Sequence, residues 1–168
     1  MDRKITIISP ELGQLFVSQI SHELNNHNLY MSFANYFGIE GLTDLETYYR
    51  KRAHEEYIHY SWIMDYLTNG DYRFEHPLIS GVIEKPNDYL FPFSATVKRE
   101  IETTQLIYKI YELANEQKDF MTASWLYEKL IKEQIEEENT SRMAESIAQQ
   151  DTTNWFSKAE SILELLEN

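Results

Sequence analysis

Hydrophobic side chains recur at helical spacing through the first part of the chain, but the middle of their stripe is polar. Ser9 before Pro10 is a typical N-cap followed by a proline in the first turn, and Gly38 is a typical stop. The inward positions are Leu12, Phe16, Ile20, Glu23, His27, Tyr30, Ala34 and Phe37. The pattern predicts an amphipathic helix over residues 10–38.

A second helix is predicted over residues 44–69. Thr43 and Glu46 have the spacing of a capping box, and Asn69-Gly70 is a stop signal. Its inward positions are Leu45, Tyr49, Arg52, Glu56, His59, Ile63 and Tyr66. Again the middle of the buried stripe is polar.

Two more long helices with polar residues in their inward stripes are predicted in the second half of the chain. Ser94 is a candidate N-cap for a helix over residues 94–117, and Asp119 is one for a helix over residues 120–149. A short amphipathic helix is predicted over residues 154–167. The inward positions of the two long helices are Val97, Glu100, Thr104, Ile107, Tyr111 and Ala114, then Ala123, Leu126, Leu130, Gln134, Glu137, Ser141, Ala144 and Ala148.

The connections between the helices predict an all-α fold, a single-domain four-helix bundle with a short fifth helix at the C-terminus. The first and second helices, and the third and fourth, are joined by short links that force them antiparallel. Residues 70–93 hold three of the four prolines and form one long connection. A connection of this length can cross the whole bundle, so we expect the second and third helices to start at the same end.

Four inward glutamates meet at one level of this bundle. Glu23 and Glu56 lie at similar distances from the first hairpin, and Glu100 and Glu137 lie at similar distances from the second. Burying such charges without compensation costs several kcal/mol each, so we expect a cation among them.

Composition narrows the chemistry of that cation. The 168 residues contain no cysteine and carry a formal net charge of −13. No stretch is basic enough for a nucleic acid partner, and no apolar run suits a membrane span or, in the first ten residues, a signal peptide. We therefore expect a cytoplasmic protein whose metal ligands are oxygen and imidazole.

Carboxylates with one histidine suit iron or manganese, and with less discrimination zinc. Glu56 and His59 have the Glu-x-x-His spacing that places both side chains on one helix face, although an isolated copy of this motif is weak evidence. Neutralising four acids needs two divalent ions.

At this point the sequence resembles the ferritins, most closely the non-haem bacterial type, over nearly its whole length. The matching stretches are His22-Glu23-Leu24 with Tyr30, residues 52–59 with Asp65-Tyr66-Leu67, Glu100 with Glu112-Leu113-Ala114, and residues 133–138. The resemblance implies that Glu23, Glu56 and His59 hold one iron. It implies that Glu56 bridges to a second iron held by Glu100 and Glu137, with Gln134 beside the pair.

The resemblance also implies a third iron site and an electron donor. The third site matches Glu55, Glu133, Glu136 and Glu137, and Tyr30 matches a tyrosine beside the centre. The plain alternatives are a solvated run of charge at residues 133–138 and simple core packing for Tyr30.

One feature departs from the pattern of the family that the sequence resembles, and two others bear on which branch it resembles most. His27 lies on the inward stripe, where it would be a base next to the ligands, an added ligand, or a residue that faces elsewhere. Gln134 and Glu137 replace the second Glu-x-x-His of haem-binding bacterioferritins, and Tyr57 replaces their methionine, so haem is not expected. The fifth helix favours the larger cage over the mini-ferritins.

The implied function is iron storage with ferroxidase activity. Fe(II) would be oxidised by O₂ or peroxide and stored as a ferric mineral inside a homo-oligomer of twenty-four subunits. Two alternatives stay open. One is another di-iron oxidase or peroxidase of the same bundle class, and the other is a metal-free structural bundle whose acids are protonated or paired with Arg52.

Overall fold

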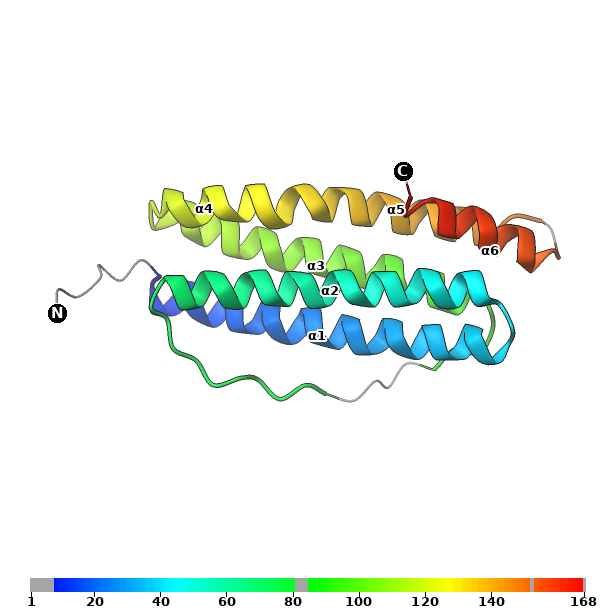
Figure 1. Cartoon of the computed structure of the whole chain (residues 1–168). Helices are drawn as coiled ribbons and strands as arrows, with labels where there is room; N and C mark the ends of the chain where they lie inside the picture. Colours follow the sequence, from blue (N-terminus) through cyan, green and yellow to red (C-terminus); the bar gives the residue numbers. More distant parts are fainter. Residues whose placement is uncertain (1–7, 81–84, 152, 168) are drawn as a thin grey trace.

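The computed structural model describes residues 8–80, 85–151 and 153–167, and every regular element in these ranges is helical (Figure 1). The elements are α1 (Pro10–Ile39), α2 (Thr43–Asn69), α3 (Phe91–Glu116), α4 (Phe120–Leu126), the π-helical turn η1 (Tyr127–Ile131), α5 (Lys132–Ala148) and α6 (Trp155–Glu164). The predicted all-α four-helix bundle with a short fifth helix is confirmed. The expectation that the first ten residues are not a signal peptide concerns mainly residues 1–7, which lie outside the described residues.

Two of the predicted helix caps are present. The Ser9 hydroxyl accepts a hydrogen bond from the backbone N–H of Leu12 at 3.2 Å, and Pro10 follows it in the first turn. The Asp119 carboxylate accepts one from the backbone N–H of Thr122 at 3.0 Å. Each cap satisfies a backbone donor that the helix itself leaves without a partner.

Two other predicted caps are wrong. Thr43 is the first residue of α2, and the N-cap position is Leu42, which makes no side-chain cap bond. α3 begins three residues before Ser94, because the Asp88 carboxylate accepts from the backbone N–H groups of Leu90 and Phe91 at 2.9 and 2.8 Å. This start was missed because the preceding loop supplies the acceptor.

The helix predicted over residues 120–149 is interrupted by the π-helical turn η1. A π turn holds more residues than an α turn, so it changes which side chains face inward after it. Leu126, Leu130 and Gln134 are all buried, and each lies four residues after the one before. In a regular α-helix of 3.6 residues per turn, two successive steps of four would rotate the third side chain away from the first. The turn therefore keeps Gln134 and the residues after it directed into the bundle.

The described parts of the connection between α2 and α3, residues 70–80 and 85–90, run along the bundle (Figure 1). α2 and α3 consequently start at the same end, as the length of the link predicts. α1 packs against both α2 and α3, and α3 packs against α5. Within the described ranges, no helix is both long and apolar enough to cross a bilayer.

Hydrophobic packing is divided into two clusters by a polar layer. One cluster lies toward the α1–α2 turn and includes Phe37, whose ring stacks on Tyr49 at 5.6 Å. The other includes Phe16 and Leu126. Burying each such side chain stabilises the fold by roughly 1.5–3 kcal/mol. Along each long helix the inward glutamate lies between residues of the two clusters, so the packed ends hold the polar layer in place.

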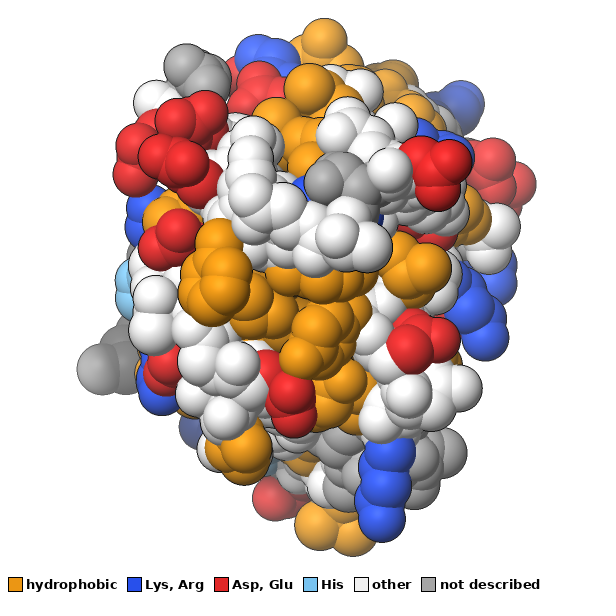
Figure 2. All heavy atoms as spheres, turned by 90° about the vertical axis from the view of Figure 1, so that its right-hand side faces the viewer, with side chains coloured by type: hydrophobic (Ala, Val, Ile, Leu, Met, Phe, Trp, Pro, Cys, Tyr) orange, Lys and Arg blue, Asp and Glu red, His pale blue; other side chains and the backbone are white. Residues whose placement is uncertain are grey.

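α6 packs against α2 and α5 near the end of the bundle that carries the α1–α2 turn (Figure 1). Figure 2 looks onto this end and shows hydrophobic side chains gathered at its middle, with charged ones around them. Tyr89 contacts the rings of Tyr36 and Trp155 at 6.0 and 5.1 Å. The Lys158 ammonium donates to the carbonyl oxygens of Ala148 and Gln150 at 2.7 and 2.8 Å, which fixes α6 on the end of α5.

Candidate metal centre

Each long segment of the bundle contributes one buried carboxylate to the polar layer. Glu23 comes from α1, Glu56 from α2, Glu100 from α3 and Glu137 from α5, and none is more than 7% exposed. His59 lies one turn after Glu56 and is 4% exposed. The structure therefore brings together all five residues that were expected at the core of the site.

Three of these side chains form a compact group. Ligand atoms of Glu23, Glu56 and His59 all lie within 4.8 Å of one another. The His59 ring is placed between two acids, with Nδ1 4.0 Å from a Glu23 oxygen and Nε2 3.6 Å from a Glu137 oxygen. Such a group has the donor set and the size that a divalent ion needs.

Glu23 is oriented by a residue that the sequence interpretation missed. The Gln19 side-chain amide donates to Glu23 Oε1 at 2.6 Å, and both residues are buried. Gln19 lies one turn before Glu23 on α1, so its spacing was the available signal. A hydrogen bond of this kind fixes the direction of a ligand's free oxygen.

Glu100 is surrounded by donors from three other helical segments. The Tyr30 hydroxyl donates to Oε1 at 2.6 Å and the Arg52 guanidinium donates to the same oxygen at 2.7 Å. The Gln134 amide donates to Oε2 at 2.8 Å. Both oxygens of Glu100 are thus engaged by the protein itself.

Other carboxylate oxygens in the layer have no such partner. Glu23 Oε2, Glu56 Oε2 and Glu137 Oε2 are buried, and none accepts a hydrogen bond from the described residues. Buried acceptors without a partner are rare in folded proteins because desolvation makes them costly. Three of them in one layer indicate a site built for an added cation.

The electrostatics of the layer favour bound protons when no metal is present. Burial raises the pKa of Glu56 well above its ordinary range, and the neighbouring Glu100 and Glu23 raise it further. Burial raises the pKa of Glu137 to about 8, although His59 and Arg52 oppose the shift. A cation that binds these carboxylates must displace their protons.

The pKa of His59 is shifted in the same sense. Burial alone would lower the pKa of His59, but the carboxylates of Glu137, Glu23 and Glu100 outweigh it and raise the value above 6.5. A ligand imidazole must be neutral, so this group also releases its proton when a metal binds.

The residues expected at a third site are not gathered into a group. Glu55 is partly exposed and pairs with Arg52 at 3.0 Å. Glu133 and Glu136 are exposed on α5, as a solvated run of charge would be. In the described part of the chain, the one cluster of three close ligand atoms is that of Glu23, Glu56 and His59.

His27 makes a structural contact. It is half-buried, and its Nδ1 donates to the backbone carbonyl of Ala53 at 2.7 Å. It lies outside the group of close ligand atoms. We interpret His27 as a link between α1 and α2. Of the three alternatives considered from the sequence, this is the one in which the side chain faces away from the ligands.

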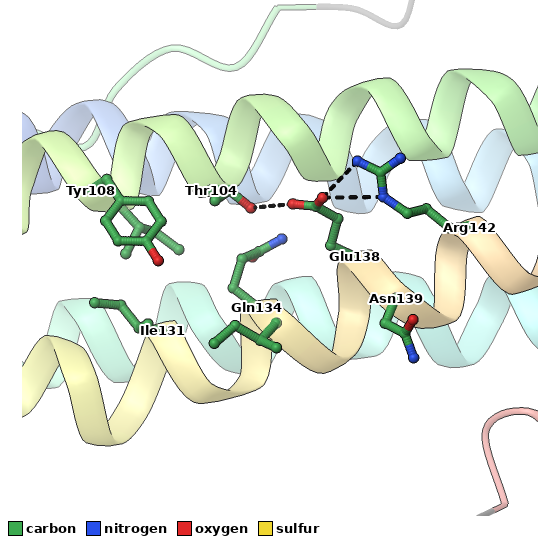
Figure 3. Close-up of a pocket in the computed structure, with 9 residues that line it drawn as sticks. Thr104, Tyr108, Ile131, Gln134, Glu138, Asn139 and Arg142 are labelled. Atoms are coloured by element: carbon green, nitrogen blue, oxygen red, sulfur yellow. Dashed lines mark hydrogen bonds and ion pairs between the residues drawn. The ribbon is translucent and has the colours of Figure 1, made fainter.

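A pocket of about 320 Å³ opens beside the centre, between α3 and the η1–α5 segment (Figure 3). Its lining is partly hydrophobic, with Ile131 and Tyr108, and partly polar. Glu138 accepts from the Thr104 hydroxyl at 2.9 Å and from Arg142 at 2.8 Å. Gln134 lines this pocket and also donates to Glu100, so its side chain lies between the pocket and the buried acids.

Comparison with known proteins agrees with this geometry. The family model of the ferritin-like domain matches residues 14–152. A bacterial non-heme ferritin of Staphylococcus epidermidis is 31% identical over 138 residues, which cover 80% of each chain. The bacterial non-heme ferritin of Staphylococcus saprophyticus is 28% identical over 135 residues, 79% of this chain and 78% of that one.

Solved structures show the same fold. An open pore ferritin from the archaeon Archaeoglobus fulgidus superimposes with a TM-score of 0.87 at 23% identity, covering 95% of this chain and 98% of that one. A humanized archaeal ferritin gives a TM-score of 0.87 at 25% identity and covers 94% and 96%. The family match and the shared fold lead to one conclusion: this chain belongs to the ferritin family.

Proposed function

We propose that this protein stores iron and that the buried layer is its di-iron ferroxidase centre. Fe(II) enters the layer, is oxidised by O₂ or peroxide, and leaves as Fe(III) for storage as a ferric mineral. The mineral would lie inside a hollow homo-oligomer of twenty-four copies, each a single ferritin-like domain. We place the protein in the cytoplasm, without a haem, nucleic acid or membrane partner.

One observation carries this proposal. Four buried carboxylates share one layer with a single arginine, so three negative charges are left uncompensated if all four acids ionise. One divalent ion would leave the layer negative, so compensating all three charges takes two. The bacterial non-heme ferritin names of the relatives support iron as the ion.

We assign the ligands from the contacts in the layer together with the resemblance to the non-haem bacterial ferritins, which supplies the bridging role of Glu56 and the second set. Glu23, Glu56 and His59 hold the first ion, since their ligand atoms are already close. Glu56 bridges to the second ion, which Glu100 and Glu137 hold. Holding both ions next to one another in a water-poor core lets the protein position them for oxidation and stabilise the developing charge.

Two buried neighbours support the second half of the centre. Gln134 and Tyr30 each donate a hydrogen bond to Glu100. Tyr30 is fully buried, and its hydroxyl is hydrogen-bonded directly to Glu100, a proposed ligand. This position suits a role as an electron donor. We also keep Glu55, Glu133, Glu136 and Glu137 as the proposed third iron site, on the inner side of the assembly.

The contact between Arg52 and Glu100 favours a second candidate, the metal-free structural bundle. In that case, the arginine and bound protons would satisfy the acids permanently. The buried, unpartnered oxygens of Glu23 and Glu56 speak against it, because a purely structural layer has no reason to leave them without donors.

An anaerobic Fe(II) titration followed by air tests the proposal. Wild-type protein is expected to bind about two ions per chain, to turn over on oxygenation, and to elute as a large particle by size-exclusion chromatography with light scattering. Binding of no iron would contradict the centre. A small particle would contradict the cage and leave the centre in place.

The effect of pH on stability is a separate prediction. In the metal-free protein the raised pKa values of Glu56, Glu137 and His59 mean that the folded state binds protons more tightly than the unfolded chain. Their stabilising contribution is present at low pH and is lost as the pH rises through the raised pKa of each group, which for Glu137 is about 8. Metal binding removes this dependence, so the gain in Tm on adding Co²⁺ should increase from pH 6 to pH 8.

Differential scanning fluorimetry at matched ionic strength measures this gain. A Glu137→Gln variant should show a smaller increase over the same interval, because it lacks one of the titrating groups. A gain in Tm that is the same at pH 6 and pH 8 would show that metal binding displaces no protons.

A further inference from the structure

Arg52 is a permanent cation inside the proposed centre. It is 1% exposed, and its Nη2 donates to Glu100 Oε1 at 2.7 Å and to the Ser141 hydroxyl at 3.4 Å. Its Nη1 lies 3.6 Å from a Glu137 oxygen. A guanidinium stays charged at every physiological pH, so it contributes one positive charge to the layer at all times.

The charge of Arg52 is unevenly placed within the layer. Its two closest acids there are Glu100 and Glu137, the proposed ligands of the second ion. Glu23, Glu56 and Glu137 each keep a buried oxygen that accepts no hydrogen bond from the described residues, whereas both oxygens of Glu100 are engaged. The first half of the centre is therefore open to a cation, whereas in the second half the guanidinium already binds Glu100 and lies near Glu137.

The second partner of Arg52 lies at the edge of the layer. Nη1 donates to Glu55 Oε2 at 3.0 Å, and the Glu55 side chain is 36% exposed. Glu55 follows Arg52 on the same face of α2, three residues later. If the guanidinium leaves Glu100, it can remain paired with this carboxylate and so stay compensated.

We propose that Arg52 acts as a displaceable internal cation that makes the two metal sites load in order. The first ion binds to Glu23, Glu56 and His59. The second binds only when it takes Glu100 and Glu137 from the guanidinium, which then pairs with Glu55 alone. This inference rests on the proposed function, since it concerns the same two sites.

The same contact affects the proposed third site. The Glu55 Oε2 atom that accepts from Arg52 cannot bind a third ion at the same time. Displacing Arg52 onto Glu55 makes that carboxylate less available just as the second site fills. The third site is thus expected to be the weakest of the three in this chain.

Anaerobic titration with Co²⁺ tests the order of loading without any oxidation step. Isothermal calorimetry gives the two affinities, and visible absorption follows the coordination of each Co²⁺ ion. Wild-type protein is expected to bind one ion tightly and the second at least tenfold more weakly. Arg52→Gln should tighten the second site at least tenfold and change the first by much less.

Arg50→Gln is the matched control. Arg50 lies on the same helix, but it is exposed and pairs with Glu46 at 2.8 Å. The substitution therefore removes one positive charge, as Arg52→Gln does, but at a distance from the layer. Its two affinities should equal those of the wild type. Circular dichroism and size-exclusion chromatography show that each variant is folded, and Arg52→Lys keeps the charge if the Gln variant does not fold. That Lys variant should retain the weak second site.

Glu55→Gln tests the displacement in the opposite direction. Without this carboxylate the guanidinium has nowhere to move, so the second site should weaken further. In a protein that carries both Arg52→Gln and Glu55→Gln, this weakening should disappear, because no guanidinium is left to move.

Two failures are distinguishable. Equal affinities at both sites in the wild type, or an Arg52→Gln variant with an unchanged second site, would overturn the displaceable cation while the di-iron centre stands. Absence of Co²⁺ binding in the wild type, or Co²⁺ binding that Glu23→Gln leaves unchanged, would overturn the proposed function and this inference together.

Discussion

Replacing Glu56 by alanine is expected to slow Fe(II) oxidation by about 100-fold or more, which corresponds to an activation free energy higher by about 2.7 kcal/mol. Glu56 is the residue that both proposed iron positions share, so its loss weakens both ions and removes the bridge between them. The measurement is the initial rate of Fe(III) formation by stopped-flow absorbance after air is added to anaerobically loaded protein. A His59→Ala variant should fail to bind the first ion, and its oxidation rate should fall by a factor similar to that of Glu56→Ala.

The control for these variants is His54→Ala. His54 lies on the same helix, but its side chain is exposed to solvent, so the rate should stay within about twofold of the wild type. Oxidation at the wild-type rate in Glu56→Ala would show that the iron is oxidised elsewhere. In that case, the buried layer would be structural.

Replacing Arg52 by leucine is expected to destabilise the metal-free protein by about 3–5 kcal/mol. Removing one partner of a buried ion pair leaves the other charge uncompensated, which is far costlier than losing a surface pair. Here the charge left behind is that of Glu100, since the raised pKa of Glu137 keeps that carboxyl protonated near neutral pH. At roughly 2–4 °C per kcal/mol for a chain of this size, the Tm measured by calorimetry should fall by about 6–20 °C.

Arg50→Leu is the matched control, because its ion pair with Glu46 is largely exposed to solvent. It should change stability by less than about 1 kcal/mol. Adding Co²⁺ should restore a larger share of the Tm in Arg52→Leu than it adds to the wild type, since the ion replaces the missing charge. An Arg52→Leu protein as stable as the wild type would mean that the ion pair contributes nothing.

The outline of the bundle was readable from the sequence because it depends on local rules. Ser9 and Asp119 are residues whose short side chains cap helices, and the structure uses both of them. Ser94 has the same chemistry but lies inside α3, because the Asp88 carboxylate supplies acceptors earlier in the chain. Several side chains can compete for one helix start, and their relative positions decide which succeeds.

The gathering of the acids was also readable. Glu23, Glu56, Glu100 and Glu137 were expected at one level from helix lengths and hairpin positions, and the structure places all four in one buried layer. The π-helical turn before Gln134 was not expected. Such a turn depends on how a whole helix packs on its neighbours, and no local residue signal specifies it.

Sequence and tertiary structure therefore decided different things about this protein. The sequence by itself determined the helices, their antiparallel order and the set of inward acids, since periodicity and link length are local properties of the chain. Only the tertiary structure decided how those acids divide: Glu23 and Glu56 form an open group with His59, Arg52 binds Glu100, and Glu137 lies between His59 and Arg52. That division depends on contacts between residues from different helices, where distances of a few ångströms set which charge compensates which.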